Sequence, residues 1–264
     1  DVFVVNNTVT GKYARAVNLY RSLNTIILNQ VAYGGDDGLE IWGSNNSIIK
    51  DCINLSGNVD DVFISSSYGL SVNNTFINCS YDINKETVNG EENELIRKWY
   101  YQAYTNYSNG TAVAGVNISA YNTTGDIQFT TLTNPSGLIN RQEVTEYVNT
   151  GGTRNYQTPH TVNVTKSGYS TNSTSYNLTI LQNVFANIIL GETSCECPGL
   201  NINWELDMSE YCNITTNCDL GTGNMTFINV GETRFNATVS TLNMEYPITG
   251  QTIFMQSGGL IKVG

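Results

Sequence analysis

A short repeat of β-strand-forming segments dominates the first third of this chain. Three runs that begin with asparagine recur at intervals in the twenties, and two further apolar runs between them are separated by a similar interval. In chain order the five runs are Asn24–Asn29, Gly38–Trp42, Asn46–Asp51, Asp61–Ser65 and Asn74–Cys79. A period in the low twenties, with Gly, Asn and Ser between short strands, is typical of a solenoid whose coils must stack to bury their apolar faces. The repeat predicts a right-handed parallel β-helix.

The composition supports an all-β chain. Asn (36 residues), Thr (31) and Ser (20) are abundant, which favours strands and turns over helices, while 16 Tyr and 8 Phe argue against disorder. The net charge of −11 with only 12 Lys and Arg speaks against nucleic acid as a partner. No apolar run approaches the length of a membrane-spanning helix.

The repeat resembles the β-helix repeats of large archaeal and bacterial surface proteins with a pectate-lyase-like scaffold. The residues that carry this resemblance are GGDDGLEIWGSNNSIIKDC (34–52) and GNVDDVFISSSYGLSVNNTFINC (57–79). The resemblance implies a fold and not an activity, because this scaffold carries lyases, hydrolases, adhesins and structural rods. We expect β-helix coils over residues 1–90, and an archaeal surface protein is the expected source.

Beyond an acidic linker at residues 82–94, short strands with turns between them predict a β-sandwich over residues 95–190. The expected strands are Leu95–Tyr104, Val116–Tyr121, Ile127–Leu132, Leu138–Val148, His160–Lys166, Tyr176–Ile180 and Val184–Leu190. NGTAVAGVNISAYNTTGDIQFTTLTNPSGLI (109–139), VNVTKSGYSTNSTSYNLTI (162–180) and the turn at 166–169 resemble the carboxypeptidase-regulatory-like, transthyretin-type module. In that family the module is an accessory spacer and not a catalyst.

Residues 191–264 are predicted to begin a second, partial β-helix after a Gly/Pro/Cys hinge at 191–200. The apolar runs expected to form its strands are Trp204–Leu206, Met225–Ile228, Arg234–Val239, Leu242–Met244, Gln251–Met255 and Leu260–Val263. Coils at both ends of the chain suggest that copies stack head to tail. Because such a contact does not close into a ring, it would build a filament. The alternative is that the chain is part of a longer surface protein.

Two pairs of acidic residues, Asp36-Asp37 and Asp60-Asp61, lie one coil apart and are expected at one edge of the solenoid. Stacked carboxylates would bind Ca²⁺ or serve as acid and base toward a polysaccharide. A lyase also needs a basic residue, and Lys50 is the one nearby. The competing interpretation is that each Asp satisfies backbone groups at a corner of the coil, which we favour over catalysis.

No other constellation predicts catalysis. His160, the single histidine, is far in sequence from any acidic or cysteine cluster and is expected at the surface. Five tyrosines cluster near the start of the sandwich, where they would pack a sheet face or stack on sugar rings. These are Tyr100, Tyr101, Tyr104, Tyr107 and Tyr121.

Acceptor motifs for N-glycosylation, Asn-x-Ser/Thr, occur fifteen times, whereas about seven would arise by chance in a chain of this composition. We therefore predict covalent N-glycans on an exported protein. The acceptors are Asn6, Asn45, Asn54, Asn73, Asn78, Asn106, Asn109, Asn117, Asn122, Asn163, Asn172, Asn177, Asn213, Asn224 and Asn236.

The six cysteines also favour export. Cys52 and Cys79 are separated by little more than one repeat, which suits a bridge between adjacent coils. Cys195, Cys197, Cys212 and Cys218 are expected to form two more bridges, because their spacing does not match a usual zinc site.

The sequence therefore predicts an extracellular, N-glycosylated structural protein of the cell surface that is not an enzyme and needs no cofactor. Its partners would be copies of itself and surface polysaccharide. The alternatives are a polysaccharide lyase or hydrolase, and a carbohydrate-binding adhesin.

Overall fold

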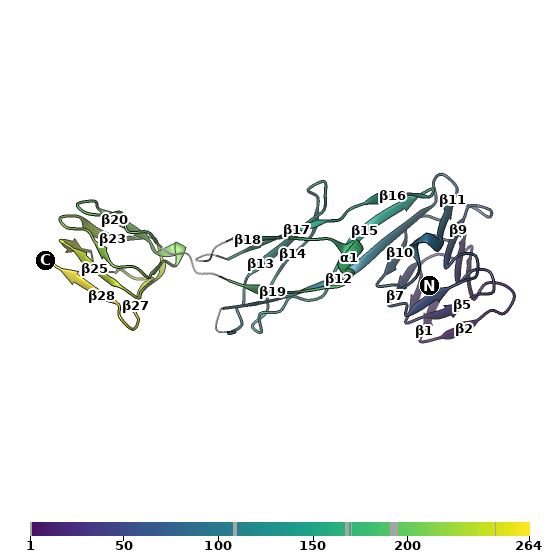
Figure 1. Ribbon diagram of the computed structural model, residues 1–264, viewed down its shortest axis with the longest axis horizontal. Helices are drawn as coiled ribbons and strands as arrows, with labels where there is room; N and C mark the ends of the chain where they lie inside the picture. The colour runs from purple at the N-terminus through teal and green to yellow at the C-terminus, as the bar shows by residue number, and fades with distance from the viewer. Residues whose placement is uncertain (1, 108–109, 167–168, 170, 191–194, 246) are drawn as a thin grey trace.

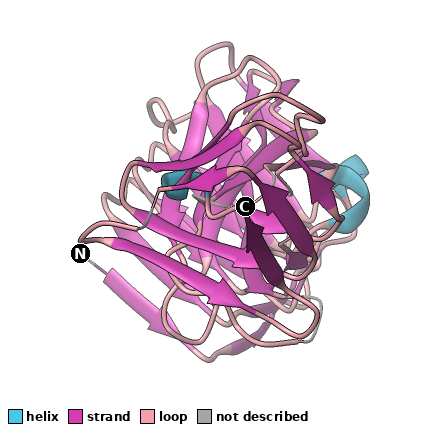
Figure 2. Ribbon diagram, turned by 90° about the vertical axis from the view of Figure 1, so that its left-hand side faces the viewer, coloured by secondary structure: helices cyan, strands magenta, loops and turns pink. Residues whose placement is uncertain are grey.

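The computed structural model describes residues 2–107, 110–166, 169, 171–190, 195–245 and 247–264. It is an all-β structure, with 52% of residues in strands and 4% in helices, so the predicted fold class is confirmed. The molecule is elongated, with two solenoids at its ends and further β-sheets between them (Figure 1). With the C-terminal end facing the viewer, the molecule consists almost entirely of strands and loops, and its helices are short (Figure 2).

The N-terminal solenoid has three parallel sheets, and each coil contributes one strand to each sheet until the last coil. The first sheet contains β1 (Val2–Val5), β4 (Thr25–Leu28), β7 (Ile48–Lys50) and β10 (Asn74–Ile77). The second contains β2 (Thr8–Thr10), β5 (Val31–Tyr33) and β8 (Asn54–Ser56). The third contains β3 (Val17–Tyr20), β6 (Leu39–Trp42), β9 (Val62–Ser65) and β11 (Glu86–Asn89). All five predicted repeat segments lie in this solenoid.

Stacked asparagines turn the chain at the corners of this solenoid. Asn24, Asn46 and Asn73 have φ of 54°, 57° and 55°, a left-handed conformation that asparagine tolerates better than most residues. The Asn73 amide donates to Asn46 Oδ1 in the preceding coil at 2.8 Å. The same asparagine corner therefore recurs before β4, β7 and β10, and a side-chain hydrogen bond joins the last two corners.

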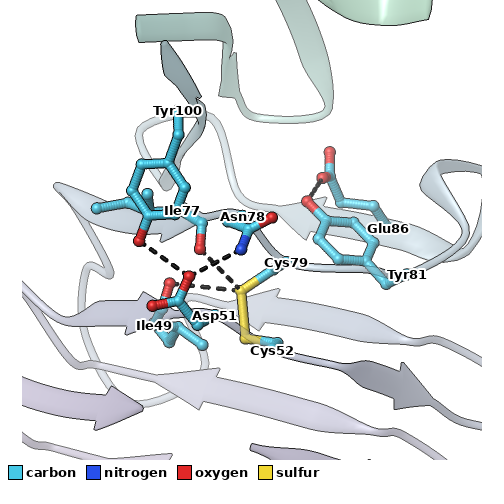
Figure 3. The surroundings of a disulfide bond; sticks show 9 residues. All are labelled: Ile49, Asp51, Cys52, Ile77, Asn78, Cys79, Tyr81, Glu86 and Tyr100. Carbon is cyan, nitrogen blue, oxygen red and sulfur yellow. Dashed lines mark hydrogen bonds between the residues drawn. A yellow bond between two sulfur atoms is a disulfide. The ribbon is translucent and has the colours of Figure 1, made fainter. Parts of the chain in front are cut away.

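The core between the three sheets consists of inward-facing aliphatic residues from every coil, including Ile27, Ile49, Leu39 and Ile64, which are fully buried. These residues alternate with outward-facing positions, as the two-residue period of a strand requires. A disulfide between Cys52 and Cys79 joins the third and fourth coils inside this core, as the spacing predicted (Figure 3).

One long strand, β12 (Glu94–Asn106), joins the solenoid to the middle of the molecule. Its residues 95–98 pair with β10 of the solenoid, and its residues 101–106 pair with β19 (Val184–Ile189). Its other edge pairs with β15 (Gln142–Thr150), which pairs in turn with β16 (Thr153–Tyr156). The first solenoid sheet therefore continues without a break into the middle of the chain.

A second sheet of the middle region contains β13 (Asn117–Tyr121), β14 (Ile127–Leu132), β17 (His160–Thr165) and β18 (Asn172–Tyr176), all antiparallel. Side chains of this sheet and of β12, β15 and β19 share one hydrophobic core, which includes Trp99, Tyr101, Ile118 and Val162. The two sheets therefore pack face to face.

Two strand predictions differ from the structure in this region, and one strand was missed. The strand expected at Tyr176–Ile180 is instead the end of β18 followed by the short helix α1 (Leu178–Leu181), whose Asn177 cap accepts a hydrogen bond from the Thr179 N–H. The strand expected at Leu138–Val148 begins only at Gln142, and β16 was not predicted. Of the turn at 166–169, residues 167–168 lie outside the described residues.

The C-terminal solenoid has three coils and three short parallel sheets. They are formed by β20 (Trp204–Asp207), β23 (Asn224–Ile228) and β26 (Asn243–Met244); by β21 (Asn213–Ile214), β24 (Gly231–Phe235) and β27 (Gln251–Met255); and by β22 (Cys218–Asp219), β25 (Thr238–Thr241) and β28 (Leu260–Val263). The run Arg234–Val239, expected as one strand, is split between β24 and β25 because the coil turns a corner there.

Two disulfides, Cys195–Cys212 and Cys197–Cys218, fasten the segment before β20 to the core of this second solenoid. The cysteine sulfurs are therefore used in bridges, as predicted, and not in a metal site. Residues 191–194 of the expected hinge lie outside the described residues.

Candidate functional site on the solenoid face

The outer face of the sheet β3-β6-β9-β11 combines aromatic rings, arginines and carboxylates. Leu39 and Ile41 of β6 point into the core, so Glu40 and Trp42 point outward. The register places Tyr20 of β3, in the preceding coil, beside Trp42. We call the surface formed by Tyr20, Trp42, Tyr68, Arg15 and Arg21 the aromatic face.

Three rings pack together on this face. The centroid of Tyr68 lies 5.0 Å from that of Trp42 in a stacked arrangement and 5.0 Å from that of Tyr20 in an edge arrangement. Tyr20 and Tyr68 are 47% and 43% exposed, so the cluster is open to solvent although its rings contact one another. Exposed rings of this kind can bind ligands that have both an apolar face and polar groups.

Gly43 allows this arrangement. Its φ is +57°, and a Cβ atom at this position would lie only 2.6 Å from the backbone oxygen of Tyr68. A glycine directly after β6 therefore lets the loop that carries Tyr68 lie against the sheet.

Two arginines border the rings. The guanidinium carbon of Arg15 lies 4.3 Å from the Trp42 ring centroid, and that of Arg21 lies 5.4 Å from the Tyr20 centroid. The Arg15 guanidinium also forms an ion pair with Glu40, which is almost fully buried. Burial raises the pKa of Glu40, and the Arg15 charge opposes this effect. The face therefore presents cationic donors beside aromatic rings.

The acidic pairs lie at one edge of the same sheet, in adjacent coils as expected. Asp61 is buried, and its carboxylate accepts the backbone N–H groups of Gly57 at 3.0 Å and Asp82 at 2.8 Å. Asp60 accepts the Thr87 hydroxyl at 2.8 Å. These bonds hold the corner of the coil together, which is the structural role that the sequence favoured over catalysis.

The hypothesis of a calcium site at Asp36, Asp37, Asp60 and Asp61 requires several of their oxygens to converge. Within the described residues, the one group of potential metal ligands with atoms this close together is Cys195, Glu210 and Cys212, and both of its cysteines belong to a disulfide. The acidic pairs are therefore not among the described groups of three or more side chains whose ligand atoms all lie within 4.8 Å of one another.

Lys50, the candidate base for a lyase, lies on a different sheet from the acidic pairs. It is part of β7, and its Nζ is 2.9 Å from Glu143 Oε1. Burial raises the pKa of Asp37. A hydrogen bond with the Asp60 backbone and the Arg15 charge oppose this effect, whereas the charges of Asp60 and Asp36 add to it. The expected grouping of Lys50 with the aspartates is therefore wrong. Two other cations in the described residues interact near this edge: Arg15, which pairs with Glu40, and Lys85, whose Nζ lies 4.0 Å from Asp61.

The five tyrosines do not form one surface. Tyr101 lies in the core of the middle region, and the Tyr100 hydroxyl donates to Asp51 at 2.9 Å beside the first disulfide (Figure 3). The Tyr104 hydroxyl donates to the Gly110 carbonyl, and Tyr107 lies against Tyr169. Tyr121, at the end of β13, is half-buried. The sugar-stacking hypothesis therefore suits Tyr20, Trp42 and Tyr68 better. The spacing of Tyr20 and Trp42 by one coil was a signal in the sequence for these two, but not for Tyr68.

His160 is buried, with 2% of its surface exposed, so the prediction of a surface residue is wrong. It begins β17, and its backbone pairs with Tyr176 of β18. Neither ring nitrogen has a hydrogen-bond partner within the described residues, and burial lowers its pKa to about 4 from the usual 6.5.

His160 is expected to make the folded state less stable in acid. Because its pKa is lower in the folded protein than in the unfolded chain, protonation favours unfolding as the pH falls from about 6.5 to about 4, and the loss reaches about 3 kcal/mol. The variant His160→Leu should lose less stability than the wild type between pH 7 and pH 4 in urea unfolding. Identical pH dependence in both proteins would contradict this account.

The predicted glycan acceptors differ in accessibility. Asn6 and Asn73 are exposed, whereas Asn45, Asn54, Asn78, Asn117, Asn163, Asn172, Asn177, Asn213, Asn224 and Asn236 are partly exposed. Asn109 lies outside the described residues. Asn106 and Asn122 are each 8% exposed, so we expect no glycan on either amide. The Asn122 amide also closes the turn to Asp126 and donates to Gln157 at 2.7 Å.

The comparisons with known proteins give no family. No protein-family model matches the chain, and no curated protein matches it. None of the helices in the described part of the chain has the length and apolar character that crossing a membrane requires.

Proposed function

We propose that the chain is an extracellular, N-glycosylated structural protein of a cell surface. The observation that carries this proposal is the complete pairing of its six cysteines in three disulfides, each of which joins a buried part of a solenoid. Structural disulfides of this kind persist in oxidising compartments outside the cytosol. The accessible Asn-x-Ser/Thr motifs along the chain fit the same location.

The mechanical role is supported by the connection between the first solenoid and the middle region. β12 is hydrogen-bonded to both, and Glu86 of the last solenoid strand accepts hydrogen bonds from Asn149 and Arg154 of β15 and β16 at 2.7 and 2.9 Å. A continuous sheet with a buried polar network resists bending at this point more than a flexible linker does. The chain then acts as a stiff spacer.

Head-to-tail assembly is the second part of the proposal. Both solenoids have three parallel sheets, and their coils are similar in length: Ile26 pairs with Ile48, and Trp204 pairs with Met225. Coils of similar size can stack by main-chain hydrogen bonds between copies. A contact of this kind between different ends builds a filament.

One experiment tests both parts. The chain is secreted from a host that performs N-glycosylation, and its glycopeptides are mapped by mass spectrometry while its particles are examined by electron microscopy. We expect glycans at exposed acceptors such as Asn6 and Asn73, none at Asn106 and Asn122, no free thiols, and filaments. Unmodified monomers with free thiols would contradict the proposal, and glycosylated monomers would remove the assembly part alone.

A second candidate function, carbohydrate binding, is favoured by the aromatic face. Tyr20, Trp42 and Tyr68 offer rings for the apolar face of a sugar, and Arg15 and Arg21 offer donors for its hydroxyls. On a glycan array, the variant Tyr68→Ala should reduce binding about tenfold, because the ring that covers Trp42 is lost. The matched control Tyr13→Ala removes a tyrosine that is 80% exposed and is not part of the cluster. Equal binding by both variants would exclude this face.

A further inference from the structure

A cavity of about 280 Å³ lies where the first solenoid meets the middle region. It is bounded by β12, β15, the segment after β10 and the helix α1, which Figure 1 places beside β12 and β15. Its volume lies below the range of about 300–1,000 Å³ that is usual for drug-sized ligands, so it suits a smaller molecule. The functions proposed above do not use this cavity.

The cavity is lined by two buried charged side chains. Arg97 is 4% exposed and Glu146 is 3% exposed, and the Arg97 Nε lies 3.4 Å from Glu146 Oε2. The Trp99 indole N–H donates to the same carboxylate oxygen at 2.5 Å. The Arg97 Nε makes no hydrogen bond within the described residues. A buried donor without an acceptor is unfavourable unless a ligand or water supplies the acceptor.

Three aromatic side chains also line the cavity. Tyr81 and Trp99 line it, and the Arg97 guanidinium carbon lies 4.6 and 4.9 Å from their ring centroids. Tyr156 also lines it and is 39% exposed. Thr179 and Gln182, at the ends of α1, contribute an exposed hydroxyl and an exposed amide. The cavity therefore combines aromatic side chains with a buried charged pair and with polar groups near solvent.

We propose that this cavity binds one neutral sugar ring. Arg97 needs an acceptor and Glu146 offers acceptor oxygens, and sugar hydroxyls both accept and donate hydrogen bonds. A carboxylate ligand would satisfy Arg97 but would be repelled by Glu146, and an ammonium ligand would have the reverse difficulty. The apolar face of the ring would lie against Trp99 or Tyr81.

The test is saturation-transfer NMR on the secreted full chain. The probes are methyl glycosides of neutral hexoses and N-acetylhexosamines, with a uronic acid and free amino acids as further arms. We expect binding of at least one neutral sugar. Gln182→Phe should weaken this binding about tenfold by filling the cavity, whereas Ile180→Phe on the same helix, 77% exposed and not lining the cavity, should leave it unchanged.

A second variant acts at the base of the cavity. Glu146→Gln is expected to weaken binding of the same sugar about tenfold, because a charged acceptor is replaced by a neutral amide, and circular dichroism checks that the fold is retained. Tyr68→Ala on the aromatic face should leave this binding unchanged, which separates the two sites. The proposal is overturned if no neutral sugar binds, if amino acids bind in their place, or if neither Gln182→Phe nor Glu146→Gln weakens binding.

Discussion

Replacing Glu86 with glutamine is expected to lower the free energy of unfolding by about 3 to 5 kcal/mol. The Glu86 carboxylate is buried and accepts hydrogen bonds from the hydroxyls of Tyr81 and Tyr147, the Asn149 amide and the Arg154 guanidinium. Its hydrogen bond with Tyr81 is drawn in Figure 3. Glutamine keeps one acceptor oxygen and turns an N–H₂ group toward donors, so buried donors lose their partner and Arg154 loses its counter-charge.

The matched control is Glu143→Gln in the same region. Glu143 pairs with Lys50 at 2.9 Å, and both side chains are about one-third exposed, so we expect a change within about 1 kcal/mol. Chemical denaturation followed by far-ultraviolet circular dichroism measures both variants. Similar losses for Glu86→Gln and Glu143→Gln would show that the network around Glu86 does not hold the solenoid to the middle region.

The second large loss of stability is expected when the disulfide between the third and fourth coils is removed. The double variant Cys52→Ala and Cys79→Ala opens a loop of 27 residues, and we expect it to cost about 3 to 4 kcal/mol through the greater freedom of the unfolded chain. Alanine is chosen because both cysteines are buried among aliphatic residues, where a serine hydroxyl would add a desolvation cost.

The second solenoid provides the comparison for this prediction. Cys195→Ala with Cys212→Ala opens a loop of 17 residues in a different core, so it should lower the stability of the C-terminal coils and leave the N-terminal coils unchanged. Hydrogen exchange followed by mass spectrometry locates each effect. If the Cys52–Cys79 variant exchanges faster only in the C-terminal coils, or in no part of the chain, the prediction is wrong.

Several features of the fold could be predicted from the sequence because they repeat. The Asn-led runs recur with the length of one coil, and the three strands β4, β7 and β10 lie within them. The bridge between Cys52 and Cys79 follows from the same period. The sequence predictions failed where a single side chain determined the local structure. At Asn177, for example, the side chain caps the helix α1 after β18, where a strand was expected.

The candidate sites were harder to predict from the sequence. Tyr20 and Trp42 are one coil apart and predictable in principle, but Tyr68 reaches them only because its loop lies on Gly43. Arg97 and Glu146 are far apart in sequence and approach each other through the antiparallel pairing of β12 with β15. A sequence repeat cannot reveal such a pair, because the contact between its two residues occurs only once in the chain.

The sequence by itself determined that the chain is all-β, that its first part is a parallel β-solenoid and that its cysteines form bridges. The reason is that strand alternation, corner residues and coil length are local and repeat along the chain. Only the tertiary structure decided that His160, Asn106 and Asn122 are buried and that a cavity with a buried charge pair lies beside α1. Burial depends on which sheets pack together, and residues distant in sequence determine that packing.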